Sequence, residues 1–189
     1  MTAVPDPLAL YEAKALAELA DANALAGVAA GGWSGDPLGA VALVVATAAS
    51  TEDVESGILP ADVHEAAGKA LAALGFEEDS AFVIASRPRE ARPDARAARL
   101  RLALEAVDAT LVLALDPLAA DDLAAAFGLN GLEPGKPVRA AGRVLGSTGD
   151  FAASLGDVRA KGRVWAAMRS VAAAAGHRTQ AKRPSGASR

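Results

Sequence analysis

A continuous apolar run at residues 41–46, Val-Ala-Leu-Val-Val-Ala, constrains the fold more than any other feature of the chain. A strand that is apolar at every position, and not only at alternate ones, is typical of a parallel sheet that helices cover on both faces. Similar runs lie at residues 81–86 and 110–115. Residues 137–147 predict a hairpin or a bent final strand around Ala141-Gly142.

Helical patterns lie before, between and after these strands. They occupy residues 7–30, 62–75, 94–107, 117–127 and 157–175. Strands that alternate with helices predict an α/β fold, a three-layer α/β/α sandwich around a mainly parallel four-stranded sheet.

Local signals place the ends of several helices. Asp62 and Glu65 have the spacing of a capping box, Asp116-Pro117 is typical of a helix start, and Gly75 is typical of a helix end. Residues 31–39, which contain Trp33, are expected to form a loop.

The chain length and these patterns fit one domain. We expect a single α/β domain over residues 1–176, with an N-terminal helix and loop at 1–39 and the core at 40–176. Residues 177–189 are basic, contain serine, proline and glycine, and are predicted to be a disordered tail.

The composition excludes several kinds of chemistry. The 189 residues contain no cysteine, which excludes disulfides, thiolate catalysis and cysteine-bound zinc or iron–sulfur clusters. With only two histidines, His64 and His177, we expect no metal site and no cofactor. No apolar run reaches the roughly 20 residues of a membrane-spanning helix, and no signal peptide is visible, so we expect a soluble cytoplasmic protein.

The net charge of −4 conceals a strong separation of charge along the chain. Residues 1–80 contain thirteen acidic side chains against Lys14 and Lys69, whereas residues 159–189 contain eight basic side chains and no acidic one. This pattern indicates an anionic partner at the basic end, or pairing between the two halves, or simply a cationic tail without a specific partner.

Several short strings, in their order along the chain, resemble the uracil-DNA glycosylase superfamily, especially its small bacterial branches. The resemblance spans about residues 8–175. The strings are Gly68-Lys69-Ala70-Leu71-Ala72-Ala73-Leu74-Gly75, the Arg87-Pro88 pair after the second strand, residues 111–127, Gly135-Lys136-Pro137-Val138, and a last helix with Lys161 and Trp165. The resemblance implies a glycosylase-like fold.

The residues that carry the chemistry of that family are not matched here. The family's water-activating Asp, Glu or Asn falls on Thr47, and its strand-end Asn falls in residues 83–86, which contain none. Its late histidine falls near residues 147–150, Ser-Thr-Gly-Asp. A hydroxyl is a poor base near neutral pH, and loss of a donor to the leaving group removes a large part of such catalysis. The resemblance therefore implies a degenerate active site.

Small polar residues are expected to surround the pocket that the resemblance implies. These candidates are Thr47, Ser50, Ser86, Ser147, Thr148 and Asp150. Their hydroxyls could donate to a phosphate or a base, but turn and cap chemistry is the commoner role of such residues. Glu52 and Asp150 are the carboxylates that could replace the missing water-activating group.

A group of arginines follows the second strand and is the best candidate for nucleic-acid binding. It comprises Arg87, Arg89, Arg92, Arg96 and Arg99. The spacing of the last three places them on one side of a helix, where guanidinium groups could bind a phosphate backbone. The alternative is a solvated face that pairs with Glu90, Asp94 and the acidic N-terminal half. Trp33 could stack on a base or a partner, or could anchor its loop.

From these observations we expect a catalytically degenerate glycosylase-like protein that binds DNA or a protein partner, in replication or repair, and that is not an enzyme. The alternative is an active DNA glycosylase or a nucleotide-processing hydrolase that uses Asp150 or Glu52. A third hypothesis is a small-molecule nucleotide binder with its ligand at the switch point of the sheet. The sequence leaves the oligomeric state open.

Overall fold

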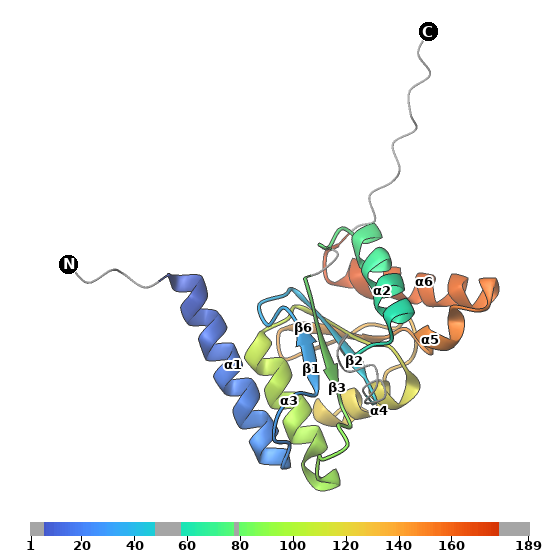
Figure 1. Cartoon of the computed structure of the whole chain (residues 1–189). Coiled ribbons are helices and arrows are strands. Elements are labelled where there is room, and N and C mark those ends of the chain that lie inside the picture. Colours follow the sequence, from blue (N-terminus) through green and yellow to red (C-terminus); the bar gives the residue numbers. More distant parts are fainter. Residues whose placement is uncertain (1–5, 48–57, 78–79, 178–189) are drawn as a thin grey trace.

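The computed structural model describes residues 6–47, 58–77 and 80–177, which form a mixed sheet covered by helices on both faces (Figure 1). The sheet has six strands in the order β1-β3-β2-β4-β6-β5. The strands are β1 (Trp33–Gly35), β2 (Val41–Val45), β3 (Ala81–Ala85), β4 (Leu111–Ala114), β5 (Val138–Ala140) and β6 (Arg143–Ser147). The helices are α1 (Pro7–Ala26), α2 (Ala61–Ala73), the 3₁₀ turn η2 (Pro93–Ala95), α3 (Arg96–Val107), α4 (Pro117–Ala126), α5 (Phe151–Ser154) and α6 (Val158–Ala174).

The predicted α/β class is confirmed, but the predicted number of strands is wrong. Strands β3, β2, β4 and β6 run parallel at the centre of the sheet, as the apolar runs indicate. Two antiparallel strands extend the edges: β1 pairs with β3, and β5 pairs with β6. Strands β5 and β6 form a hairpin, which is one of the two structures that the sequence predicts for residues 137–147. Its two turn residues, Ala141 and Gly142, both have positive φ.

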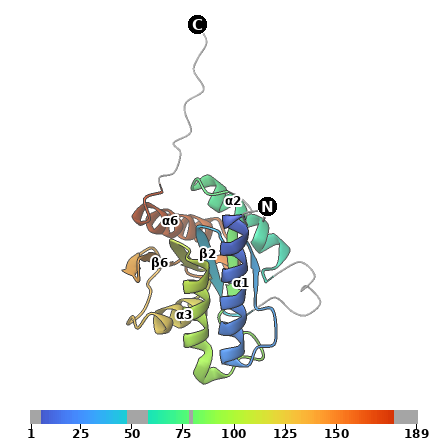
Figure 2. The same cartoon turned by 90° about the vertical axis from the view of Figure 1, so that its left-hand side faces the viewer.

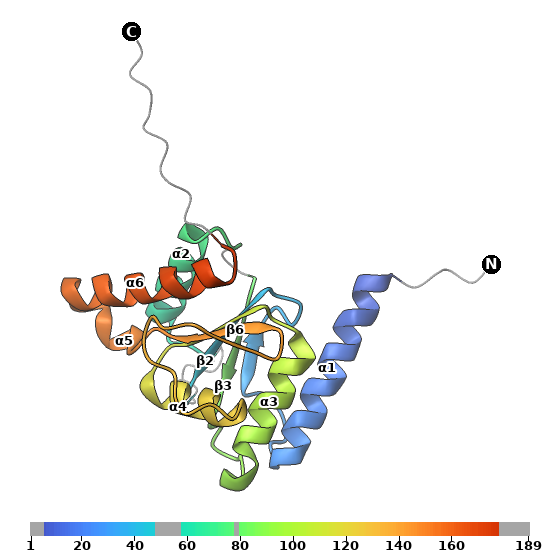
Figure 3. The same cartoon turned by 180° about the vertical axis from the view of Figure 1, so that it is seen from behind.

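The helices divide into two layers, each with its own apolar core. Helices α1 and α3 lie side by side on one face (Figure 2), where they and α4 cover the sheet. Helices α2, α5 and α6 cover the other face (Figure 3). The largest buried side chains that the helices contribute to the first layer are Leu19, Leu100, Leu104 and Leu123, and those in the second layer include Leu71, Met168 and Val171.

Most helix ends follow the predicted signals. Asp116 is the N-cap of α4, since its carboxylate accepts a hydrogen bond from the backbone N–H of Ala119, and Pro117 is the first helical residue. The predicted capping box is wrong, because α2 begins at Ala61 and has Pro60, not Asp62, as its N-cap. Helix α1 ends before the left-handed Gly27, earlier than residue 30.

The order of the strands fixes the position of a crevice. From β2 the chain passes to β3 on one side and then crosses to β4 on the other side. In an open parallel sheet, such a reversal leaves a gap outside the carboxyl ends of the two strands, here β2 and β4, because their connections leave in opposite directions. A ligand-binding site is therefore expected among the polar residues that follow β2 and β4.

Candidate functional site

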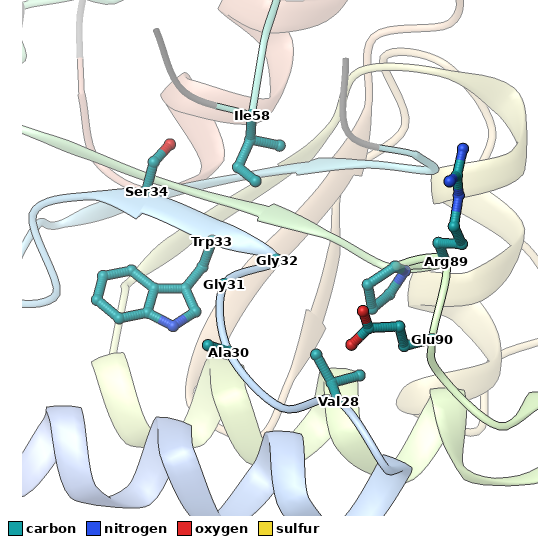
Figure 4. A pocket seen from close by; sticks show the side chains of 10 residues that line it. Val28, Ala30, Gly31, Gly32, Trp33, Ser34, Ile58, Arg89 and Glu90 are labelled. Carbon is teal, nitrogen blue, oxygen red and sulfur yellow. The ribbon is translucent and has the colours of Figure 1, made fainter. Parts of the chain in front are cut away.

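Two hollows adjoin each other along the carboxyl edge of the sheet. The first, which we call the switch-point hollow, has a volume of about 390 Å³ and lies between the ends of β2 and β4 and the starts of α4 and α5. The second, the Trp33 hollow, has a volume of about 360 Å³ and lies where β1 begins (Figure 4). Ile58 lines both hollows, so together they form one extended depression.

The switch-point hollow contains two carboxylates, and both act as helix caps. The Oδ1 of Asp116 accepts from the backbone N–H of Ala119 (2.8 Å), and its Oδ2 accepts from the backbone N–H of Ala46 (2.8 Å). Asp116 thereby joins the end of β2 to the start of α4. The Oδ1 of Asp150 accepts from the backbone N–H of Ala153 (2.9 Å) and caps α5. No basic side chain is found among the described residues that line this hollow.

The predicted pocket residues are only partly brought together. Thr47 is exposed and lines the switch-point hollow with Asp150. Three hydroxyls at strand ends are buried and take part in internal hydrogen bonds. The Oγ of Ser86 donates to Asp122, the Oγ of Ser147 accepts from the N–H of Gly149, and the Oγ1 of Thr148 donates to the carbonyl of Ala114. Ser50 and Glu52 lie outside the described residues.

Arg87 is engaged in an ion pair at the end of β3. Its Nε and Nη2 donate to the two carboxylate oxygens of Asp122 on α4, at 2.7 and 2.8 Å, and Ser86 donates to the same carboxylate at 2.6 Å. Burial raises the pKa of Asp122, but the hydrogen bonds from Arg87 and Ser86 outweigh burial and hold this pKa below its ordinary value. The bidentate pair fixes α4 against the end of β3.

The other predicted arginines do not share one exposed face. The Nη2 of Arg92 donates to the carbonyl of Leu25 at the end of α1 (2.7 Å), and Arg96 is half-buried. Arg99 is fully buried on the side of α3 that faces α1 and the sheet, where it contacts Asn23 and the carbonyl of Ala85. Arg89 is exposed and lines the Trp33 hollow.

Three further exposed arginines that local spacing did not single out lie on α6. Arg159, Arg163 and Arg169 are all exposed, and none has an ion-pair partner within the described part of the chain. Residues 158–177 contain no Asp or Glu. The absence of acidic residues after Asp157 was the available signal. The helix predicted over residues 157–175 is α6, whereas the predicted tail, apart from His177, lies outside the described residues.

Comparisons with known proteins do not indicate a function. The sequence matches no model of a known protein family, and no curated protein matches it. Across residues 6–47, 58–77 and 80–177, no cluster of side chains has the composition to hold a metal ion. The helices in the same ranges are too short or too polar to cross a membrane.

Proposed function

We propose that this protein is a catalytically degenerate, glycosylase-like binding module that contacts the phosphate backbone of nucleic acid. The observation that carries the proposal is the exposed side of α6, where Arg159, Arg163 and Arg169 have no acidic neighbour in their own helix. The four parallel strands at the centre of the sheet, covered on both faces, agree with the fold that the sequence resemblance implies.

The polar groups near the switch-point hollow support the loss of base excision. A water-activating carboxylate must reach the attacking water, and a donor must meet the developing negative charge of the leaving base. Asp116 uses both oxygens for backbone N–H groups, while Asp150 uses one oxygen to cap α5. Ser86 and Thr148 donate their hydroxyl protons to internal acceptors. These contacts stabilise the fold. Asp150 is the one carboxylate in this hollow that keeps an oxygen without a hydrogen bond to a described residue.

We expect no base release from oligonucleotides that contain uracil, hypoxanthine or xanthine. The assay incubates the protein with each labelled strand, cleaves abasic sites with alkali and resolves the products on a denaturing gel. Asp150→Asn is the matched variant, because it keeps the size of the side chain and an oxygen that can cap α5. Clear base release that disappears in Asp150→Asn would establish the alternative, an active glycosylase.

Binding to single-stranded DNA is expected to depend steeply on salt through α6. Each phosphate contact contributes about −0.7 to the slope of log K against log salt for a single strand, so R163A/R169A should make the slope shallower by about 1.4. K14A/K136A is the control, because it also removes two cations, but these pair with Glu18 and Glu133. Fluorescence anisotropy at several salt concentrations measures both slopes. Equal slopes for the wild type and R163A/R169A would contradict the proposal.

A protein partner is the second candidate, and the N-terminal end of α1 favours it. Every residue from Asp6 to Lys14 is exposed, with Leu8 at 67% and Tyr11 at 64%. This end of α1 projects beyond the body of the domain (Figure 1). Exposed apolar side chains that lie together are typical of protein–protein contacts. DNA affinity that is weak and insensitive to salt would favour this candidate over the first.

A further inference from the structure

Arg99 is a buried cation that has no carboxylate partner in the described part of the chain. Its Nε donates to Asn23 Oδ1 and its Nη1 to the carbonyl of Ala85, both at 2.8 Å, while its Nη2 has no acceptor among the described residues. Burial lowers the pKa of Arg99 to about 10, so the guanidinium remains protonated at neutral pH. A desolvated charge that meets only neutral acceptors is costly for a fold, and an anion nearby would offset that cost.

The free Nη2 of Arg99 lies directly behind the wall of the Trp33 hollow. Gly32 and Pro88 line this hollow, and a Cβ added to Gly32 would come within 2.7 Å of Nη2 and 3.5 Å of the Pro88 side chain. The missing side chain at Gly32 therefore lets the guanidinium pack against the backbone that forms the wall. Arg99 is fully buried, so its positive charge acts on the hollow across the Gly32 backbone and not by direct contact.

The exposed part of the hollow offers an aromatic surface and a second cation. One side of the Trp33 indole stacks on Phe82, with ring centroids 5.7 Å apart, and this contact holds the ring in place. Arg89 lies on the opposite side of the Gly31-Gly32 segment from Trp33 (Figure 4). Glu90 is the one acidic residue that lines the hollow; its Oε2 accepts from the backbone N–H of Ala29 at 3.5 Å, so this carboxylate lies on the Arg89 side of the Gly31-Gly32 segment (Figure 4).

We infer that the Trp33 hollow binds a nucleotide, with the base against the indole and the phosphate beside Arg89, where two cations, Arg89 and the covered Arg99, outnumber the one carboxylate, Glu90. Aromatic stacking accepts any base, and guanidinium groups supply the charge for phosphate. The inference rests on the proposed nucleic-acid function and gives it a base-binding position. A free mononucleotide and one nucleotide of a strand share this chemistry, and titration with a short oligonucleotide distinguishes them.

Trp33 itself can report the binding. The chain contains two tryptophans, so in Trp165→Phe the remaining fluorescence comes from Trp33. We expect saturable quenching by adenosine 5′-monophosphate, and affinity about tenfold lower for adenosine, which lacks the charge-assisted contacts to phosphate. Inorganic phosphate should compete with the nucleotide without quenching strongly. A short oligodeoxyadenylate then shows whether a strand enters the same hollow.

Two variants test the cations separately. Arg89→Ala should weaken the affinity for adenosine 5′-monophosphate about tenfold and leave that for adenosine unchanged, whereas Arg169→Ala on α6 should change neither. Arg99→Met, which removes the buried charge, should act in the same direction, with Arg99→Lys restoring most of the affinity. Arg89 is exposed, so Arg89→Ala keeps the test decisive where Arg99→Met does not fold.

The outcomes separate the inference from the proposed function. Quenching that is absent, equal for nucleotide and nucleoside, or unaffected by Arg89→Ala would overturn the inference, even if R163A/R169A alters the DNA salt slope as expected. Quenching by the mononucleotide, with the expected loss of affinity in Arg89→Ala, supports the inference. It does so even if R163A/R169A leaves the salt slope of DNA binding unchanged. If the oligodeoxyadenylate then fails to quench, the hollow binds a free nucleotide and not a strand.

Discussion

Replacing Gly35 by alanine is expected to lower the free energy of unfolding by about 3 kcal/mol. Gly35 ends β1 with a φ of +84°, which is unfavourable for any residue with a Cβ. In addition, the new Cβ would lie 2.1 Å from the carbonyl oxygen of Ala81, which is backbone of β3 and cannot rotate away. Urea denaturation followed by circular dichroism measures the change.

Two further glycines separate the two causes. Gly75 has a φ of +91° and no atom within 4 Å of an added Cβ, so Gly75→Ala should cost only the conformational part, about 1 kcal/mol. Gly39 lacks a left-handed φ, but its Cβ would lie 1.9 Å from the carbonyl oxygen of Ser80, so Gly39→Ala isolates the steric part. If Gly35→Ala costs no more than Gly75→Ala, β1 does not pack closely on β3, and the wall of the Trp33 hollow is not as described.

The central architecture could be predicted because its signals are local. A strand buried on both faces must be apolar throughout, and residues 41–45, 82–85 and 111–114 are all buried. The Asp116-Pro117 pair is also a local signal, because Asp116 caps α4 and Pro117 is its first residue. The edge strand β1 was missed because three residues, Trp-Ser-Gly, are too few to show a period.

The role of the arginines could not be predicted because it depends on distant partners. The spacing of Arg92, Arg96 and Arg99 would suit one side of a helix, but Arg92 precedes α3, and Arg99 lies on the side of α3 that faces α1. Arg99 is bound by Asn23, which lies 76 positions away in the sequence, and Arg87 by Asp122, which lies 35 positions away. Local charge patterns contain no information about such pairs, so they did not predict the internal contacts of Arg87, Arg92 and Arg99.

Of the residues predicted to surround a pocket, the structure places two in the lining of the switch-point hollow and buries three others. Strand ends do surround the switch-point hollow, as expected for a parallel sheet, and Thr47 and Asp150 line it. Ser86 and Thr148 also follow strands, yet each is buried against its neighbours. Which way a side chain points at a strand end depends on the pleat and on the helix packed above it, here α4 above Ser86.

Asp116→Ala is expected to destabilise the protein by about 3 kcal/mol, because Asp116 connects two elements and does not merely cap one. The substitution removes the cap of α4, worth about 1 kcal/mol. It also leaves the backbone N–H of the buried Ala46 without its acceptor, and losing a charge-assisted hydrogen bond costs about 1.5–3 kcal/mol. The measurement is the midpoint and slope of chemical denaturation.

Asp157→Ala is the matched control, because Asp157 caps α6 through Arg159 and Ala160 and, among the residues that the structure describes, accepts from no distant one. It should cost only about 1 kcal/mol. Hydrogen exchange at the amide of Ala46 distinguishes the two contributions, since Asp116→Ala should speed exchange there and Asp157→Ala should not. Equal losses of stability in the two variants would mean that Asp116 acts only as a cap, and that the end of β2 is positioned at the switch-point hollow by other contacts.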